Sequence, residues 1–165
     1  MVFGYTSSFR MGQIIRFHLK NFCEKFVNNH VFRTYLDNPV YRNGAVKYIL
    51  SEYSKDNFNL SSYKDFQVEH VFSKEPNYDT LSYGFAEDYD YEKNRFGNLG
   101  LLEKGLNIGL GNLPPINKVN GYLESKNTEM RNLAGKIQKG SFNKTNVDNR
   151  REDILEFCLK RFTLN

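Results

Sequence analysis

Residues 67–72, with the sequence QVEHVF, alternate polar and apolar side chains, and this pattern constrains the fold more than any other in the chain. Alternation with a period of two is typical of a strand that buries one face. It places Glu69 and Val71 on one face and His70 with Val68 on the other. Because strand ends next to loops are common positions for reactive groups, Glu69 and His70 are candidate functional residues.

A second strand and several helices are predicted around this segment. Gly97–Glu103 is the second strand, Asn57–Lys64 is a polar connection, and Gly105, Gly109 and Gly111 indicate a turn after the second strand. Pro114-Pro115 is the predicted start of a helix that carries Lys118 and Tyr122. Apolar residues at helical spacing predict further helices over about Ser8–Leu36, Gly44–Tyr53, Thr128–Ile137 and Asp148–Phe162. The expected fold class is α+β.

Length and composition favour one folded domain. The chain has 165 residues, 39% of them hydrophobic, with 14 Phe and 11 Tyr, which is enough to bury a core. Cys23 and Cys158 are far apart and no C-x-x-C pair exists, so we expect no zinc site and two buried thiols, as in a cytoplasmic protein. We expect no signal peptide and no membrane span, because charged residues interrupt the apolar runs.

The charges are distributed unevenly. Residues 1–66 hold nine Lys or Arg against five Asp or Glu, residues 67–117 hold four against eight, and residues 118–165 hold ten against six. An acidic centre between basic flanks fits a metal site bracketed by phosphate-binding surfaces. An ordinary solvated surface, with a quarter of its residues charged, is the alternative that this pattern leaves open.

The residue types in the acidic centre suit phosphodiester hydrolysis. A histidine with a pKa near 6.5 can accept the proton of an attacking water. The oxygens of Glu69 and Asn107 are hard ligands of the kind that Mg²⁺ prefers. Glu69-His70 could equally belong to an ordinary surface strand, and we take His18 and His30 as ordinary helix residues.

The order of these residues resembles a known family. The segments EHVF at 69–72 and GNLGLL at 97–102 are followed by single residues in a characteristic order, which are Asn107, Asn112, Lys118, Tyr122 and Ser125. This order, with a later match at Val147–Arg150, resembles the C-terminal nuclease domain of GmrSD-type modification-dependent restriction enzymes, which belongs to the HNH, or His-Me finger, superfamily. The resemblance covers about Tyr41 to Phe162.

The resemblance implies a ββα-metal (HNH) finger set among α-helices. His70 would be the general base, Glu69 and Asn107 would ligate one Mg²⁺ or Mn²⁺ ion, and Asn98 would hold the loop between the strands and so fix His70. The single domain, 1–165, would divide into a helical N-terminal part (1–66), the finger (67–126) and C-terminal helices (127–165).

Some positions depart from the family or leave two interpretations open. Ser73 stands where the family usually has proline, and the acidic, tyrosine-rich stretch 73–95 has no counterpart. Lys118, Arg150 and Arg151 are candidate nucleic-acid contacts. Lys118 could instead be merely solvated, and the two arginines could instead form ion pairs with the acidic residues that follow them. Tyr122 and Ser125 are expected to be packing and capping groups.

The resemblance implies a metal-dependent endonuclease that hydrolyses DNA in the restriction of foreign DNA. Double-stranded DNA is the expected substrate. The chain has no Walker-type glycine loop, so it would act alone or with a separate nucleotide-dependent sensor subunit. A non-catalytic nucleic-acid or partner-binding module with the same fold, and an RNA-cleaving or toxin nuclease, are the alternatives.

Overall fold

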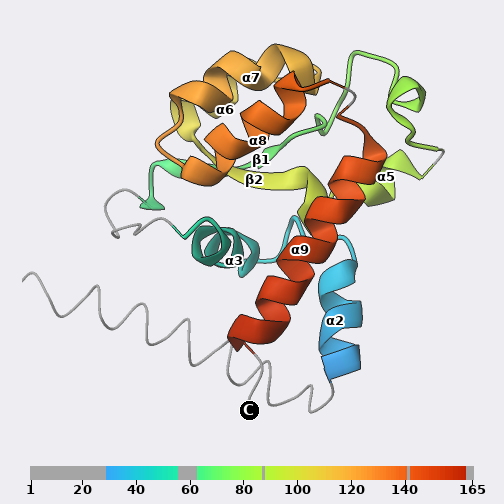
Figure 1. The fold of residues 1–165 in the computed structure, drawn as a ribbon. Coiled ribbons are helices and arrows are strands. Elements are labelled where there is room, and N and C mark those ends of the chain that lie inside the picture. Colours follow the sequence, from blue (N-terminus) through green and yellow to red (C-terminus); the bar gives the residue numbers. More distant parts are fainter. Residues whose placement is uncertain (1–28, 56–62, 87, 141, 163–165) are drawn as a thin grey trace, which may run out of the picture.

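The computed structural model describes residues 29–55, 63–86, 88–140 and 142–162, and it shows a small two-stranded sheet set among helices, as expected for an α+β fold (Figure 1). The regular elements, in chain order, are α2 (Asn29–Asp37), α3 (Val46–Tyr53), β1 (Phe66–His70), α5 (Tyr89–Glu92), β2 (Leu99–Glu103), α6 (Lys104–Leu110), α7 (Pro115–Glu124), α8 (Thr128–Gln138) and α9 (Lys144–Phe162). Two short 3₁₀ turns, η1 (Leu81–Tyr83) and η2 (Phe96–Asn98), complete the order. Within the described residues, no helix is long and apolar enough to cross a membrane.

The strands β1 and β2 are antiparallel, with Glu69 opposite Gly100 and His70 opposite Leu99. Helix α6 begins at Lys104, the residue after β2 ends, so the hairpin runs directly into a helix. The turn predicted from Gly105 and its neighbours is therefore wrong over Lys104–Leu110. Nothing lies within 4 Å of a Cβ placed at Gly105, so this glycine reflects neither a turn nor a close contact.

The two faces of the hairpin pack against different helices, and each face belongs to its own core (Figure 1). Phe66, Leu99 and Leu101 join the core made with α2, α3 and α9. Val71 and Leu102 join the core made with α7 and α8. The alternation predicted for the first strand is thus confirmed, because neighbouring residues of the hairpin enter opposite cores.

Most of the predicted helices are present, with changes at their ends. Helix α7 starts at Pro115 and α8 spans Thr128–Gln138, both as expected. Helix α9 starts four residues before the predicted Asp148, because Asn143 and Asn146 exchange side-chain-to-backbone hydrogen bonds of 3.0 and 3.4 Å that set its first turn. The first predicted helix is seen from residue 29, and its earlier part, with His18 and Cys23, lies outside the described residues.

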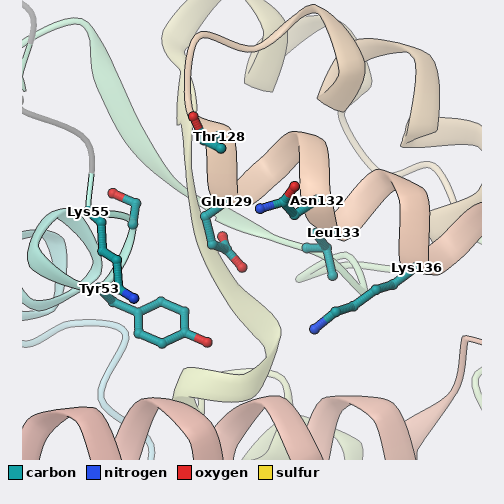
Figure 2. A pocket seen from close by; sticks show the side chains of 8 residues that line it. Tyr53, Lys55, Thr128, Glu129, Asn132, Leu133 and Lys136 are labelled. Atoms are coloured by element: carbon teal, nitrogen blue, oxygen red, sulfur yellow. The ribbon is translucent and has the colours of Figure 1, made fainter.

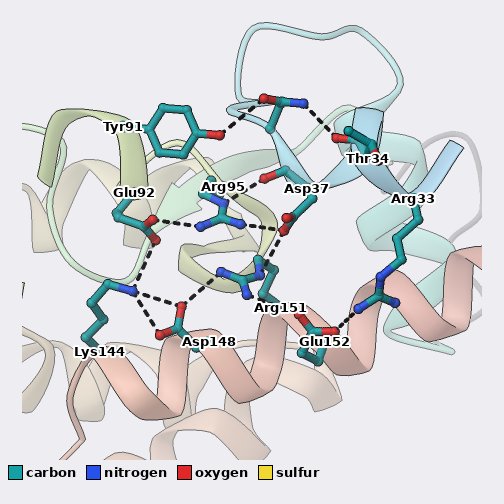
Figure 3. A network of polar contacts seen from close by, with 11 residues as sticks. Arg33, Thr34, Asp37, Tyr91, Glu92, Arg95, Lys144, Asp148, Arg151 and Glu152 are labelled. Atoms are coloured by element: carbon teal, nitrogen blue, oxygen red, sulfur yellow. Dashed lines mark hydrogen bonds and ion pairs between the residues drawn. The ribbon is translucent and has the colours of Figure 1, made fainter. Parts of the chain in front are cut away.

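A network of ion pairs attaches α9 to α2 and α5 (Figure 3). Arg95 pairs with Glu92 at 2.7 Å and also with Asp37, while Arg151 lies 3.0 Å from Asp37 and from Asp148. Helix α9 also approaches η2 closely, since a Cβ at Gly97 would lie 2.1 Å from the carbonyl oxygen of Val147. These contacts fix the residues that precede β2 against one long helix.

Candidate functional site

The loop that follows β1 is held by the side chain of Asn98, which is fully buried. Its Oδ1 accepts a hydrogen bond from the backbone N–H of Phe72 at 2.7 Å, and its Nδ2 donates to the carbonyls of Phe72 and Lys93 at 2.8 and 2.9 Å. Its backbone carbonyl accepts from the N–H of Val71 at 2.9 Å. These bonds give Asn98 the loop-holding contacts predicted for it and constrain the backbone directly after His70.

Glu69 is buried beneath α7 rather than open to solvent. Its side chain is 4% exposed, and Oε1 accepts hydrogen bonds from Lys118 Nζ at 2.7 Å and from the Tyr122 hydroxyl at 2.8 Å. Lys118 Nζ also donates to the carbonyl of His70 at 2.7 Å. Lys118 and Tyr122 are one helical turn apart on α7, so one helix face supplies both donors.

This buried pair is held together by its opposite charges. Burial raises the pKa of Glu69, and the ammonium of Lys118 opposes that rise. Burial lowers the pKa of Lys118, and the carboxylate of Glu69 opposes that fall. Each charge therefore depends on the other to remain ionised in the interior.

His70 faces the other side of the hairpin. Its ring lies edge-on to Tyr41, with centroids 4.3 Å apart, and its Nε2 is 3.3 Å from Asn94 Oδ1. Burial lowers the pKa of His70 to about 4, an effect that the hydrogen bond to Asn94 partly opposes. The imidazole is therefore neutral near pH 7 and has a nitrogen lone pair that can accept a proton.

Asn107 hydrogen-bonds to Gln67 rather than to Glu69. Its Nδ2 donates to Gln67 Oε1 at 3.3 Å, and Gln67 points to the same face of β1 as Glu69. Asn107, on α6, thus contacts the face of β1 to which Glu69 belongs, and both predicted ligands offer hard oxygen atoms. Among the described residues, no group of three or more His, Cys, Asp or Glu side chains could hold a metal ion.

The side-chain oxygens of Glu69 and Asn107 are of the type that a single hard cation prefers. Mg²⁺ is commonly bound through one or two side-chain oxygens with water completing its shell, and Glu69 with Asn107 could supply these two oxygens. Lys118 already provides a positive charge at Glu69 Oε1. Any cation held by this carboxylate therefore shares it with Lys118 or displaces that lysine.

Lys118 and Arg150, two of the candidate nucleic-acid contacts, are buried in the structure. Lys118 is 1% exposed and Arg150 is 4% exposed. Arg150 Nη1 donates to the carbonyls of Phe96, Gly97 and Leu99 at 3.2, 2.8 and 2.7 Å, and its Nε donates to Glu129 at 3.0 Å. Arg150 thus stabilises the start of β2, and Arg151 belongs to the ion-pair network of α9 (Figure 3).

Three contacts at this site were not foreseen from the sequence. Asn94 and Tyr41 both touch His70, and the Tyr122 hydroxyl binds Glu69, although only a packing role was expected for this tyrosine. The spacing of Lys118 and Tyr122 on one helix face could have indicated a shared partner. Nothing in the sequence marks Asn94, which lies in the acidic, tyrosine-rich stretch 73–95.

A separate cavity of about 550 Å³ lies between the end of α3 and α8 (Figure 2). Figure 2 shows Tyr53 and Lys55 on one side and Glu129, Asn132 and Lys136 on the other. None of the predicted site residues lines it. The cavity is therefore distinct from the surroundings of His70.

Comparison with known protein families gives one match. The model of the family described as GmrSD restriction endonucleases, C-terminal domain, matches residues 25–157, which is most of the chain. Neither the curated proteins nor the solved structures compared with the chain match it significantly. The matched range includes β1, β2, and all residues discussed above as site candidates.

Proposed function

Because the chain belongs to the GmrSD restriction endonuclease C-terminal domain family, we propose that it is a metal-dependent endonuclease that hydrolyses double-stranded DNA. The observation that carries this proposal is a neutral histidine at the end of a strand, followed by a loop that a buried asparagine holds. That arrangement, with α6 following β2, supports a ββα finger of the HNH type. We further propose that the protein acts in the cytoplasm in defence against foreign DNA.

In this mechanism His70 takes the proton from the attacking water. A pKa of about 4 keeps the ring unprotonated before the reaction but makes it a weak base. A phosphate beside the ring would add negative charge, which favours the imidazolium and opposes the lowering of the His70 pKa by burial.

The proposed cofactor is one Mg²⁺ or Mn²⁺ ion, and no zinc. Glu69 and Asn107 would hold this ion, which supplies positive charge to stabilise the phosphate as negative charge develops on it. Tyr122 and Lys118 orient the Glu69 carboxylate. The carboxylate thus has a fixed position, although it is shared with a lysine.

We propose that the basic flanks of the chain bind phosphate. The three basic residues predicted as nucleic-acid contacts, Lys118, Arg150 and Arg151, would have a restricted role in this binding. Lys118 would act on the phosphate only through Glu69, because its ammonium is buried. Arg150 would act only by holding the backbone of β2. Arg151 is the most exposed of the three, at 15% of its side chain. We also propose a separate nucleotide-dependent sensor subunit as a partner.

A non-catalytic binding module is the second candidate, and one observation favours it. His70 is only 6% exposed, and Glu69 Oε1 is fully engaged by two donors. A protein that only docks on nucleic acid or a partner would need neither group to be open. An RNA-cleaving nuclease is the third candidate, since the same chemistry acts on either nucleic acid.

The experiment that separates these candidates is incubation of the full chain with plasmid DNA and with a structured RNA, each with Mg²⁺, Mn²⁺ or EDTA. We expect DNA cleavage with either metal and none with EDTA. Asn107→Ala should raise the metal concentration required, whereas Asn132→Ala on α8, an exposed helical asparagine, should not. Metal-independent cleavage would overturn the metal proposal, and binding without cleavage would favour the module.

A further inference from the structure

The ring of His70 has two different nitrogen environments. Nε2 faces Asn94 Oδ1 at 3.3 Å. Nδ1 has no hydrogen-bond partner in the described part of the chain. The two nitrogens therefore differ in their partners.

The orientation of the Asn94 amide is set by its second contact. Its Nδ2 donates to the carbonyl oxygen of Asp90 at 3.1 Å. A carbonyl oxygen only accepts hydrogen bonds, so the atom that faces it must be the amide nitrogen. The amide oxygen consequently faces His70, and an oxygen acceptor requires that Nε2 carry the hydrogen.

The backbone of Asn94 also positions the residues that cover the ring. Its carbonyl accepts hydrogen bonds from the N–H groups of Val40 and Tyr41 at 2.9 and 3.2 Å. The Tyr41 ring packs edge-on against His70. One residue thus binds the imidazole through its side chain and places the ring beside it through its main chain.

We propose that Asn94 is a positioning residue for the reaction, which holds the Nε2–H tautomer of His70 and leaves Nδ1 as the atom that accepts the proton of water. This inference rests on the proposed nuclease function and deepens it. The proton balance is simple: Nδ1 gains the proton that the water loses, Nε2 keeps its own, and the imidazolium then donates two hydrogen bonds, one of them to Asn94. The hydroxide oxygen forms the new bond to phosphorus as the bond to the leaving oxygen breaks.

The tautomer can be observed directly, without any activity. The chain has three histidines, so ¹⁵N spectra of histidine-labelled protein at neutral pH contain few signals, and His70→Ala assigns the signals of His70. We expect the wild type to show a protonated Nε2 and an unprotonated Nδ1. A protonated Nδ1 in the wild type would overturn the proposal.

Two substitutions of Asn94 test whether this residue determines the tautomer of His70. Asn94→Leu has a similar size but no acceptor, and we expect its His70 signals to shift toward a mixture of tautomers. Asn94→Asp keeps an oxygen and should retain the wild-type tautomer. Asn38→Leu is the matched control, because the Asn38 side chain binds Tyr91 of α5, the helix that ends two residues before Asn94, and not His70. Unchanged His70 signals in Asn94→Leu would overturn the proposal.

Kinetics provide the second readout. Asn94→Leu should lower kcat by about tenfold or more with little change in KM, against about 10²–10⁴-fold for loss of the base itself. In the His70→Ala background the same substitution should have no further effect, because Asn94 acts through His70. An additional loss in that background would overturn the proposal. If the wild type cleaves no nucleic acid, the nuclease proposal fails, and the spectra still decide whether Asn94 holds the ring.

Discussion

Neighbouring polar residues on the two faces of strand β1 lie in different environments. On one face, Glu69 is sealed beneath α7 and paired with a lysine 49 positions away in the chain. On the other face, His70 carries no charge near pH 7, and among the described residues its ring contacts the amide oxygen of Asn94 and the ring of Tyr41. A buried charge needs an opposite charge to be tolerated, whereas a neutral imidazole needs only orientation.

This difference separates stability from chemistry. On the Glu69 face, Oε1 already accepts two hydrogen bonds before any substrate binds. On the His70 face, one ring nitrogen has no hydrogen-bond partner in the described part of the chain, and a reacting water could bind there. We therefore expect the loss of Lys118 to change mainly the free energy of unfolding, and substitutions on the His70 face to change mainly the reaction.

The largest effect on stability is expected from breaking the buried pair. Lys118→Met leaves the Glu69 carboxylate without its opposite charge and should lower the free energy of unfolding by about 3–5 kcal/mol. Chemical denaturation measures this change. The exposed pair of Lys160 and Glu156, with nitrogen and oxygen 3.9 Å apart, is the control, and Lys160→Met should cost less than about 1 kcal/mol.

A double substitution sharpens this result. Glu69→Gln with Lys118→Met removes both charges, so the pair should be less destabilised than Lys118→Met alone. Equal losses in the single and double variants would mean that Lys118 stabilises the fold by packing rather than by its charge.

The next effect is a dependence of stability on pH. The pKa of His70 falls from 6.5 in the unfolded chain to about 4 in the fold, so the unfolded state binds more protons between these values. The contribution of His70 to the free energy of unfolding is therefore fully present above pH 6.5 and is lost as the pH falls toward 4. The loss should be about 3 kcal/mol, measured by denaturation at several pH values.

His70→Gln is the control for that dependence, because it removes the titrating group and keeps a polar side chain. For this variant, the free energy of unfolding should change less with pH than for the wild type between pH 6.5 and 4. Parallel curves would show that other groups cause the acid sensitivity.

A smaller effect is expected at Asn98. Asn98→Ala leaves the N–H and the carbonyl of Phe72 and the carbonyl of Lys93 without this partner in the interior, and it should cost about 1–3 kcal/mol. Asn107→Ala should change stability by less than about 0.5 kcal/mol, because its one side-chain bond is exposed. Equal losses at both positions would contradict the division between a structural asparagine and a ligand.

The contrast between the faces explains what the sequence could predict. Alternation along β1 assigns each residue to a face, and Pro115 marks the start of α7, because both are local patterns. Asn98 holds the loop after β1 through its side chain, a role that only the resemblance to a family suggested. Lys118 was expected at the surface, because a lysine on a helix is usually solvated, and only the folded chain brings Glu69 to it.

Two other residues differ from their sequence-based expectations for different reasons. Arg150 lies in a polar part of α9, and nothing nearby indicates that it will reach three carbonyls around the start of β2. Gly105 suggested a turn, yet it occupies an exposed helical position where a glycine costs only about 1 kcal/mol. Long-range contacts decided the case of Arg150, and local spacing does not report them. At Gly105 no such contact exists in the described part of the chain, and the helix simply tolerates the glycine.

The most direct test of the account is the cleavage rate of His70→Ala on plasmid DNA with Mg²⁺, measured beside its circular dichroism spectrum. The account predicts a loss of about 10²–10⁴-fold in rate with the fold and DNA binding nearly intact, because His70 belongs to the face of β1 that serves the reaction. Near-wild-type cleavage by this variant would contradict the account and remove His70 from the mechanism.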